Sequence, residues 1–218
     1  MNILFDLDGT LTDSYEGITR SITHALTVVG RTPPPRESLT WCIGPPLRNS
    51  FRILLDSTED ELVDETLFAY RERFRSIGIF ENRVYDGVPE MLESLQQKDC
   101  TLYVATSKPT VFAGQIIDHF GLRDRFKTVY GSELTGERGE KTSLIAHILA
   151  SEGCAPSETT MVGDRAYDMI GSCANGLQGL GVLWGYGSIE ELQEAGASAC
   201  LQRPPELIDL FEQLCSKG

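Results

Sequence analysis

The segment Ile3-Leu4-Phe5-Asp6-Leu7-Asp8-Gly9-Thr10 joins a short apolar run to two aspartates and a glycine. This order is typical of a buried strand of a parallel sheet that ends in a polar turn. Similar short apolar runs recur further along the chain, and we expect each of them to form a strand: 101–105, 128–130, 159–162 and 181–184.

Helical patterns separate these runs. Apolar residues recur at three- and four-residue spacing in five stretches: 87–97, 109–120, 142–151, 165–174 and 204–214. Short buried strands that alternate with helices predict an α/β fold, a doubly wound parallel sheet with helices on both faces.

The stretch 15–83 departs from this alternation. Its helical patterns, at 18–29, 47–55 and 59–77, are accompanied by no convincing strand, and prolines and glycines at 32–35 and 44–46 predict turns. We therefore expect a small all-α domain at 15–83, inserted into an α/β core that consists of 1–14 and 84–218. The two connections between them would act as a hinge.

The composition restricts the partners and the location of the protein. The chain has 218 residues, a formal net charge of −13, and no apolar stretch near the roughly 20 residues that span a bilayer. This charge repels nucleic-acid backbones and anionic membrane surfaces, so neither is an expected partner. The scattered cysteines form no Cys-x-x-Cys pair and the first residues lack a targeting segment, which together predict a reducing, cytoplasmic location.

Residues that follow parallel strands meet at one edge of the sheet, where such folds bind ligands. Asp6 and Asp8 would lie there in environments that can differ, so that one carboxylate acts as a nucleophile and the other as an acid. Gly9 would let the chain bend sharply behind them. An Asp-rich turn without a catalytic role explains the same residues equally well.

Phosphate-binding candidates follow the second apolar run and open a later helix. Thr106 and Ser107 would offer hydroxyl and N–H groups to phosphate oxygens, and an ordinary helix N-cap is the alternative. Lys141 stands at the front of a predicted helix, where a cation is unfavourable unless an anion lies opposite. A solvated surface lysine is the alternative there.

Asp164 and Asp168 are the candidate metal ligands. They are four residues apart, and a helix that begins near residue 165 would bring both carboxylates to its front end. Two like charges in that position require a cation. Because no histidine or cysteine lies nearby and the ligands are oxygens, we expect Mg²⁺.

Taken together, these residues resemble the haloacid dehalogenase superfamily over essentially the whole chain. The segment from Asp6 to Ser14 is similar to the first motif of that superfamily, Thr106 to the second, Lys141 to the third, and Gly163-Asp164 with Asp168 to the fourth. The resemblance implies an enzyme that hydrolyses small-molecule phosphate esters with Mg²⁺.

The resemblance also implies roles for the carboxylates. Asp6 would attack phosphorus and form an aspartyl phosphate, and Asp8 would protonate the leaving oxygen and then activate water. Mg²⁺ would be bound by Asp6, the backbone carbonyl of Asp8 and Asp164, with Asp168 in support. Dehalogenases and ion-pumping ATPases of the superfamily lack a second aspartate at the position of Asp8, so its presence favours ester hydrolysis.

Thr106 and Lys141 would hold the transferring phosphoryl group, with Ser107 beside them. The residue after the motif lysine is often proline, and here it is Thr142. Lys108 is therefore a second candidate for the role of Lys141.

The helical insert resembles the cap of the phosphoglycolate phosphatase and β-phosphoglucomutase branch, so substrate choice is expected to depend on it. Gly44 and Arg48, in the segment 43–48, form the candidate specificity loop, in which Arg48 would bind an anionic or polar group. An interhelical turn followed by a surface arginine is the alternative.

The segment Val182-Leu183-Trp184-Gly185-Tyr186-Gly187-Ser188 is similar to one in a bacterial subgroup described as cytosolic 5′-nucleotidases. This similarity favours nucleoside 5′-monophosphates as substrates, although Trp184 and Tyr186 could equally be packing residues. A phosphatase acting on phosphoglycolate or a sugar phosphate, a mutase, and a non-catalytic binding protein are the alternatives.

Overall fold

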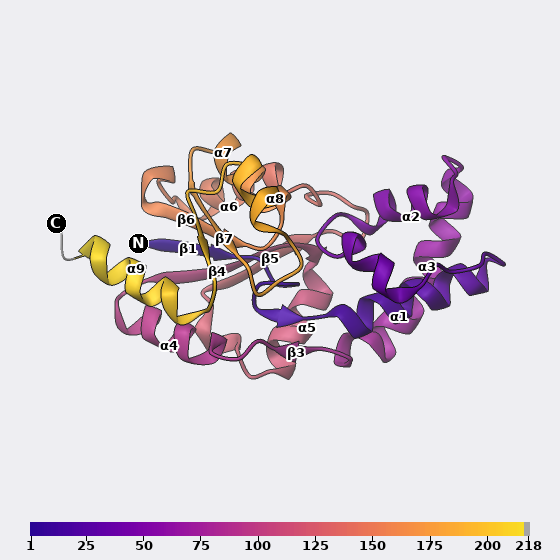
Figure 1. Ribbon diagram of the computed structural model, residues 1–218, viewed down its shortest axis with the longest axis horizontal. Coiled ribbons are helices and arrows are strands. Elements are labelled where there is room, and N and C mark those ends of the chain that lie inside the picture. Colours follow the sequence, from indigo (N-terminus) through magenta and orange to yellow (C-terminus); the bar gives the residue numbers. More distant parts are fainter. Residues whose placement is uncertain (216–218) are drawn as a thin grey trace.

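A computed structural model describes residues 1–215 and contains a six-stranded parallel sheet with helices on both faces (Figure 1). The strands lie in the order β5 (Thr128–Ser132), β4 (Thr101–Pro109), β1 (Asn2–Phe5), β6 (Thr159–Gly163), β7 (Gln178–Val182) and β8 (Ala199–Leu201). The chain begins in the middle of the sheet, builds outward through β4 and β5, and returns to β6 on the other side of β1. The predicted doubly wound α/β fold is confirmed.

Alternating side chains of β1 meet different helices. The core helices are α4 (Val88–Gln97), α5 (Thr110–His119), α6 (Lys141–Glu152), α7 (Ala166–Ala174), α8 (Ile189–Glu194) and α9 (Pro205–Cys215). Ile3 and Phe5 belong to a large apolar cluster that includes side chains of α4, α5 and α9. Leu4 belongs to a smaller cluster with α6. This alternation explains why β1 reads as a continuous apolar run, since both of its faces are covered.

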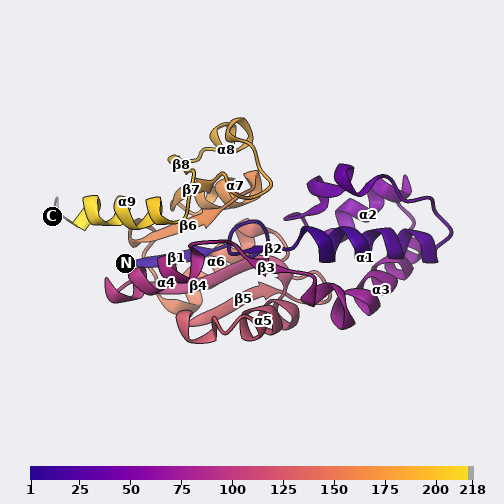
Figure 2. The same cartoon turned by 60° about the horizontal axis from the view of Figure 1, so that its bottom comes forward.

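Three helices, α1 (Tyr15–Val28), α2 (Leu47–Leu55) and α3 (Asp60–Ser76), lie together beyond one end of the sheet (Figure 2). They are joined to the core through β2 (Thr12–Asp13) and β3 (Arg83–Val84), which pair antiparallel. We call the segment 15–83 the cap. The exact division of the chain into domains stays a prediction, but the two connections lie side by side as a hinge requires.

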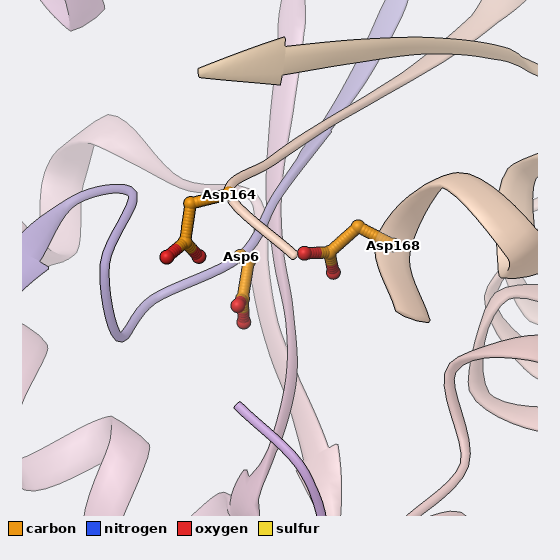
Figure 3. A group of neighbouring side chains, drawn as sticks. All are labelled: Asp6, Asp164 and Asp168. Carbon is orange, nitrogen blue, oxygen red and sulfur yellow. The ribbon is translucent and has the colours of Figure 1, made fainter. Parts of the chain in front are cut away.

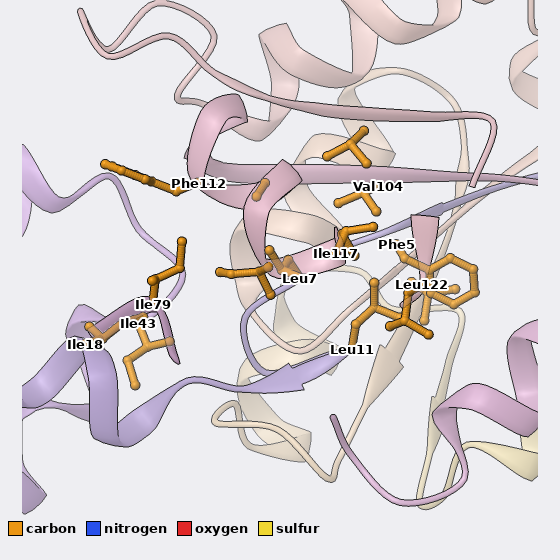
Figure 4. Close-up of a cluster of buried hydrophobic side chains, with 14 of the residues drawn as sticks. Phe5, Leu7, Leu11, Ile18, Ile43, Ile79, Val104, Phe112, Ile117 and Leu122 are labelled. Carbon is orange, nitrogen blue, oxygen red and sulfur yellow. The ribbon is translucent and has the colours of Figure 1, made fainter. Parts of the chain in front are cut away.

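The larger apolar cluster continues from the core into the cap. Figure 4 shows Ile18, Ile43 and Ile79 of the cap in the same cluster as Leu7 and Phe112 of the core. All five side chains are buried. The cap therefore packs on the core through apolar contacts.

The bounds of several elements differ from the sequence predictions. The bounds of the strand predicted at 181–184 are wrong, because β7 spans Gln178–Val182. The glycines in this strand have low strand propensity and weaken its sequence pattern. β4 continues to Pro109, so Thr106, Ser107 and Lys108 lie within its last part and not after it. A 3₁₀ helix at Arg36–Cys42 lies between the turns predicted at 32–35 and 44–46, where no element was predicted.

Four short elements were not predicted from the sequence. β8 has three residues, α8 has six, and β2 and β3 have two each, so none is long enough to show a period. In the part of the chain that the structure describes, no helix is long and apolar enough to cross a membrane.

Candidate active site

Three strand ends bring the predicted site residues together. Asp6 follows β1 directly, Thr106 lies in β4, and Asp164 follows β6. β1 pairs with both β4 and β6, and the N–H of Asp6 continues the ladder by donating to the carbonyl of Val162 at 2.9 Å. The central position of β1 therefore places Asp6 between the other two groups.

Asp6, Asp164 and Asp168 form one carboxylate cluster, which we call the acidic triad (Figure 3). One carboxylate oxygen from each lies within 4.8 Å of the others, and all three side chains are buried. Asp168 sits in the first turn of α7 and accepts a hydrogen bond from the N–H of Arg165 at 3.1 Å. The expected approach of Asp164 and Asp168 at the front of a helix is thus present.

Gly9 makes room for the triad. Its φ is +90°, and a Cβ added there would lie 2.1 Å from Oδ2 of Asp164. Both the backbone conformation and the contact exclude other side chains at this position. The glycine that the sequence placed at a bend is therefore also required for the close approach of Asp164.

Lys141 is bound to the triad and is not a surface lysine. Its Nζ lies 2.8 Å from Oδ1 of Asp6 and 2.8 Å from Oδ1 of Asp168, and it donates to the carbonyl of Ala105 at 2.6 Å. Only 3% of the Lys141 side chain is exposed. The anion that a lysine at the front of α6 requires is supplied by these carboxylates. Contact with a phosphoryl group stays a prediction for Lys141.

The electrostatics of the cluster favour a bound cation. Burial raises the pKa of Asp6 to about 6, although Lys141 acts in the opposite direction. Burial, together with the charges of Asp6 and Asp168, also raises the pKa of Asp164 well above its usual value. Burial by itself would lower the pKa of Lys141, but Asp168 and Asp6 outweigh it and the pKa is raised.

When all three carboxylates are ionised, as cation binding requires, they and one ammonium have a net charge of −2 in a site that is almost closed to solvent. A divalent cation would balance this charge. All of the donor atoms are carboxylate oxygens, the kind of ligand that Mg²⁺ prefers. The residues present therefore fit the expected ion.

Asp8 and Lys108 form a second buried pair. Nζ of Lys108 lies 2.9 Å from Oδ2 of Asp8 and 4.4 Å from the ring centre of Phe74, a residue of α3 in the cap. The other oxygen of Asp8, Oδ1, is buried and has no hydrogen-bond partner among the described residues. The two candidate lysines thus contact different carboxylates, with Lys141 at Asp6 and Lys108 at Asp8.

Thr106 and Ser107 lie beside these pairs. Thr106 is 1% exposed, and its Oγ1 accepts from the N–H of Lys108 at 3.2 Å. Ser107 lines the cavity described next, and its carbonyl accepts from Oγ of Ser132 at 2.9 Å. The residues predicted from the end of the second apolar run are therefore adjacent to Asp8 and Lys108, while their phosphate contacts stay predictions.

A cavity of about 500 Å³ lies between the core and the cap and reaches Asp6 and Asp8. From the cap it is lined by apolar and aromatic side chains, among them Ile18, Leu67, Tyr70 and Phe74, and also by polar ones: Arg48, Asn49, Asp64 and Arg71. Thr106, Ser107 and Lys108 line it from the core. Carboxylates, hydroxyl groups and a lysine thus converge at the inner end of a largely apolar space, which is the usual composition of a small-molecule site.

Residues 3–182 match the family of haloacid dehalogenase-like hydrolases. The chain belongs to this family. It is 50% identical over 192 residues to a 5′-nucleotidase of Pseudomonas aeruginosa, an alignment that covers 88% of the chain and 86% of that protein. It is 36% identical over 196 residues to the tyrosine-protein kinase PtkA of Mycobacterium tuberculosis, covering 90% of the chain and 66% of that kinase.

A crystal structure of a predicted phosphatase from Clostridium acetobutylicum is similar to this hydrolase, with a TM-score of 0.93 and 40% identity. The match covers 97% of the chain and 98% of that structure. The family and these similarities confirm the expectation of a phosphoric monoester hydrolase.

The specificity loop of the hydrolase is placed at the cavity, but its role stays a prediction. Gly44 and Arg48 both line the cavity. Gly44 has a φ of +105° and lies against the side chain of Arg165. The guanidinium of Arg48 forms ion pairs with Asp60 and Asp64, so it is already engaged within the cap.

Several residues that join the cap to the core were not predicted from the sequence. Phe74 contacts Lys108, Arg71 donates to the carbonyl of Leu134 at 2.7 Å, and Arg165 donates to the carbonyl of Ile43 at 2.7 Å. Each of these contacts joins the cap to the core. No motif signals them, because they depend on how the two parts pack.

Proposed function

We propose that this hydrolase is a Mg²⁺-dependent 5′-nucleotidase that releases phosphate from nucleoside 5′-monophosphates through an aspartyl phosphate on Asp6. The observation that carries the proposal is the cavity, which joins a polar inner end at Asp6 and Asp8 to an apolar and aromatic wall in the cap. A phosphate would occupy the first part and a nucleoside the second.

In the first step, an oxygen of Asp6 attacks phosphorus and the bond between phosphorus and the ester oxygen breaks. Asp8 gives its proton to the leaving oxygen, for which its unpartnered Oδ1 is available at the cavity. Water then attacks the aspartyl phosphate, Asp8 takes the proton from that water, and the bond between phosphorus and Asp6 breaks.

Mg²⁺, when bound by Asp6, Asp164, Asp168 and the carbonyl of Asp8, supplies positive charge to the phosphate oxygens. Lys141 holds the nucleophile through its contact with Asp6. The cap excludes water from the buried groups, which strengthens these electrostatic interactions. The high identity to a named 5′-nucleotidase supports the same assignment.

The cap favours an uncharged leaving group over a second anion. Both cap arginines at the cavity are engaged, Arg48 with two aspartates and Arg71 with the carbonyl of Leu134. A carboxylate such as that of phosphoglycolate would have to displace Asp60 and Asp64 from Arg48 to be paired there, which is unfavourable. Tyr70 and Phe74 instead offer aromatic faces to a planar base.

A panel of phosphate esters tests the proposal. With Mg²⁺ present, kcat/KM for UMP or IMP is expected to exceed that for phosphoglycolate by about tenfold or more. The reverse order would refute the substrate assignment, and full activity after chelation of Mg²⁺ would refute the cation requirement. Transfer of phosphate from ATP to a tyrosine peptide belongs in the panel, and if it were the faster reaction it would refute the proposal.

Two variants test the nucleophile. Asp6→Asn is expected to abolish turnover on every ester, because the amide cannot form the aspartyl phosphate. Asp118→Asn makes the same chemical change at an exposed ion pair with Arg123 and is expected to keep wild-type activity. Persistent activity in Asp6→Asn would show that another group attacks phosphorus.

A further inference from the structure

Tyr186, in the segment after β7, contacts both the acidic triad and the connection between core and cap. The backbone N–H of Tyr186 donates to Oδ2 of Asp164 at 2.8 Å, and the phenol of Tyr186 donates to Oδ1 of Asp13 at 2.8 Å. Asp164 belongs to the acidic triad, whereas Asp13 is the last residue of β2 at the edge of the cap. A single residue thus joins the cation-binding carboxylates to the connection between core and cap.

Asp13 forms hydrogen bonds with both sides of the predicted hinge. Arg83, its partner in the β2–β3 pair, donates to Oδ2 of Asp13 from Nε at 3.0 Å and from Nη2 at 2.8 Å. The N–H of Tyr15, the first residue of α1, donates to Oδ1 at 3.3 Å. The Asp13 carboxylate therefore fixes both hinge strands, the first cap helix and Tyr186 relative to one another.

The main chain around Tyr186 has little freedom to move away from Asp164. A Cβ added to Gly185 would lie 2.3 Å from the carbonyl oxygen of Gly9, and one added to Gly187 would lie 1.9 Å from the carbonyl oxygen of Asp164. These glycines let the segment lie directly on the residues that carry the triad. A displacement of Asp164 would therefore move Tyr186 with it.

The phenol is suited to hold an anion permanently. Burial and the nearby Tyr85 and Asp13 raise the pKa of Tyr186 well above its usual value, so the phenol keeps its proton. Burial would raise the pKa of Asp13, but the hydrogen bonds from Tyr186 and Arg83 outweigh it and the pKa is lowered. The pair is thus a neutral donor facing a stable carboxylate, which is among the stronger kinds of hydrogen bond.

We propose that Tyr186 is a positioning residue that couples binding of a cation at Asp164 to the position of the cap hinge at Asp13. The proposal rests on the proposed binding of Mg²⁺. A cation that draws in the Asp164 carboxylate steadies the backbone of Tyr186, and its phenol then holds Asp13 and the hinge strands. By thermodynamic linkage, a cap held in this position favours cation binding by the same factor.

Hydrogen exchange of the full chain, followed by mass spectrometry with and without Mg²⁺, tests this coupling. In the wild type, Mg²⁺ is expected to slow exchange in the hinge segments 10–15 and 82–86 by about fivefold or more, the lower end of typical couplings. Tyr186→Phe removes the phenolic donor and keeps the backbone N–H to Asp164. This variant is expected to bind Mg²⁺ in calorimetry while its hinge exchange changes by less than about twofold.

Tyr130→Phe is the matched control. It removes a phenol that donates to Oε1 of Glu152 at 2.6 Å, a contact that does not involve the hinge or the triad, and it is expected to keep the wild-type response to Mg²⁺. If Tyr186→Phe does not fold, Asp13→Ala removes the acceptor of the same bond. That variant is likewise expected to lose the response of the hinge segments.

Two results would overturn the inference while the proposed function stands. One is a hinge response in Tyr186→Phe equal to that of the wild type, and the other is a wild-type hinge that does not respond although calorimetry shows Mg²⁺ binding. Absence of Mg²⁺ binding to the wild type would overturn this inference together with the proposed cation site. The relative kcat/KM values of the esters in the substrate panel test the substrate assignment only, and they do not test the coupling.

Discussion

Asp6→Asn is expected to stabilise the metal-free protein near neutral pH, although it removes the proposed nucleophile. Asp6 is 2% exposed, and its pKa is raised from 3.8 to about 6. At neutral pH the folded protein must therefore keep a buried carboxylate charged, close to the carboxylates of Asp164 and Asp168. Asparagine has a similar shape and no charge.

The sign and size follow from proton linkage. A carboxyl whose folded pKa is raised contributes stability that is fully present below pH 3.8 and is lost as the pH rises through about 6. The difference between the two pKa values corresponds to about 3 kcal/mol at neutral pH. For a chain of this size, this equals a difference in Tm of about 6 to 12 °C. Asparagine does not titrate, so the variant avoids this loss.

Urea unfolding of metal-free protein at pH 4, 5.5 and 7.5 measures the effect. At pH 7.5 Asp6→Asn is expected to exceed the wild type in unfolding free energy by about 3 kcal/mol, with the gap shrinking towards pH 4. Asp118→Asn is the matched control at an exposed site and is expected to show no such pH-dependent gain. Equal stability of Asp6→Asn and wild type at pH 7.5, or a gap that is as large at pH 4, would refute the reasoning.

Two further substitutions test the surroundings of the carboxylates. Gly163→Ala places a Cβ 2.2 Å from Cγ of Asp168 and is expected to weaken Mg²⁺ binding by about 10- to 100-fold in calorimetry; unchanged affinity would remove Asp168 from the cation site. Lys108→Met removes the ammonium at Asp8 and is expected to lower kcat on p-nitrophenyl phosphate by about tenfold or more. Lys127→Met removes an exposed lysine from an ion pair with Glu152 and is its control, and equal kcat in the two variants would show that Lys108 does not act on Asp8.

The residues at the strand ends of the site could be predicted from the sequence, because a parallel sheet fixes where its strands end. Asp6, Thr106 and Asp164 each stand at the end of a short apolar run, and neighbouring parallel strands end at the same edge. The presence of Lys141 at the site follows from the superfamily motifs and less clearly from the residue itself, since a lysine at a helix front has several explanations, but its contacts with Asp6 and Asp168 were not predicted. The order of the strands along the chain and their parallel direction are thus sufficient to predict that Asp6, Thr106 and Asp164 lie close together.

Other contacts depend on packing that no local pattern encodes. Tyr186 and Asp13 are 173 positions apart, and Lys108 of β4 meets Phe74 of α3 only where the cap packs on the core. The bounds of β7 were wrong for a related reason, since its glycines are selected by close packing and lower the strand signal. Sequence periodicity reports which face of an element is buried, but not which distant element covers it.

Lys108 has a consequence for how substrate choice should be measured. Its ammonium contacts Asp8, the proposed acid, and lies over Phe74, which lines the cavity from the cap. A leaving group that packs well against Phe74 would hold Lys108 and Asp8 in place, and one that displaces Phe74 would disturb both. Contacts between the leaving group and the cap then affect the position of the acid that reacts. Discrimination between esters should therefore appear in kcat as well as in KM. An enzyme whose cap served for binding alone would discriminate through KM.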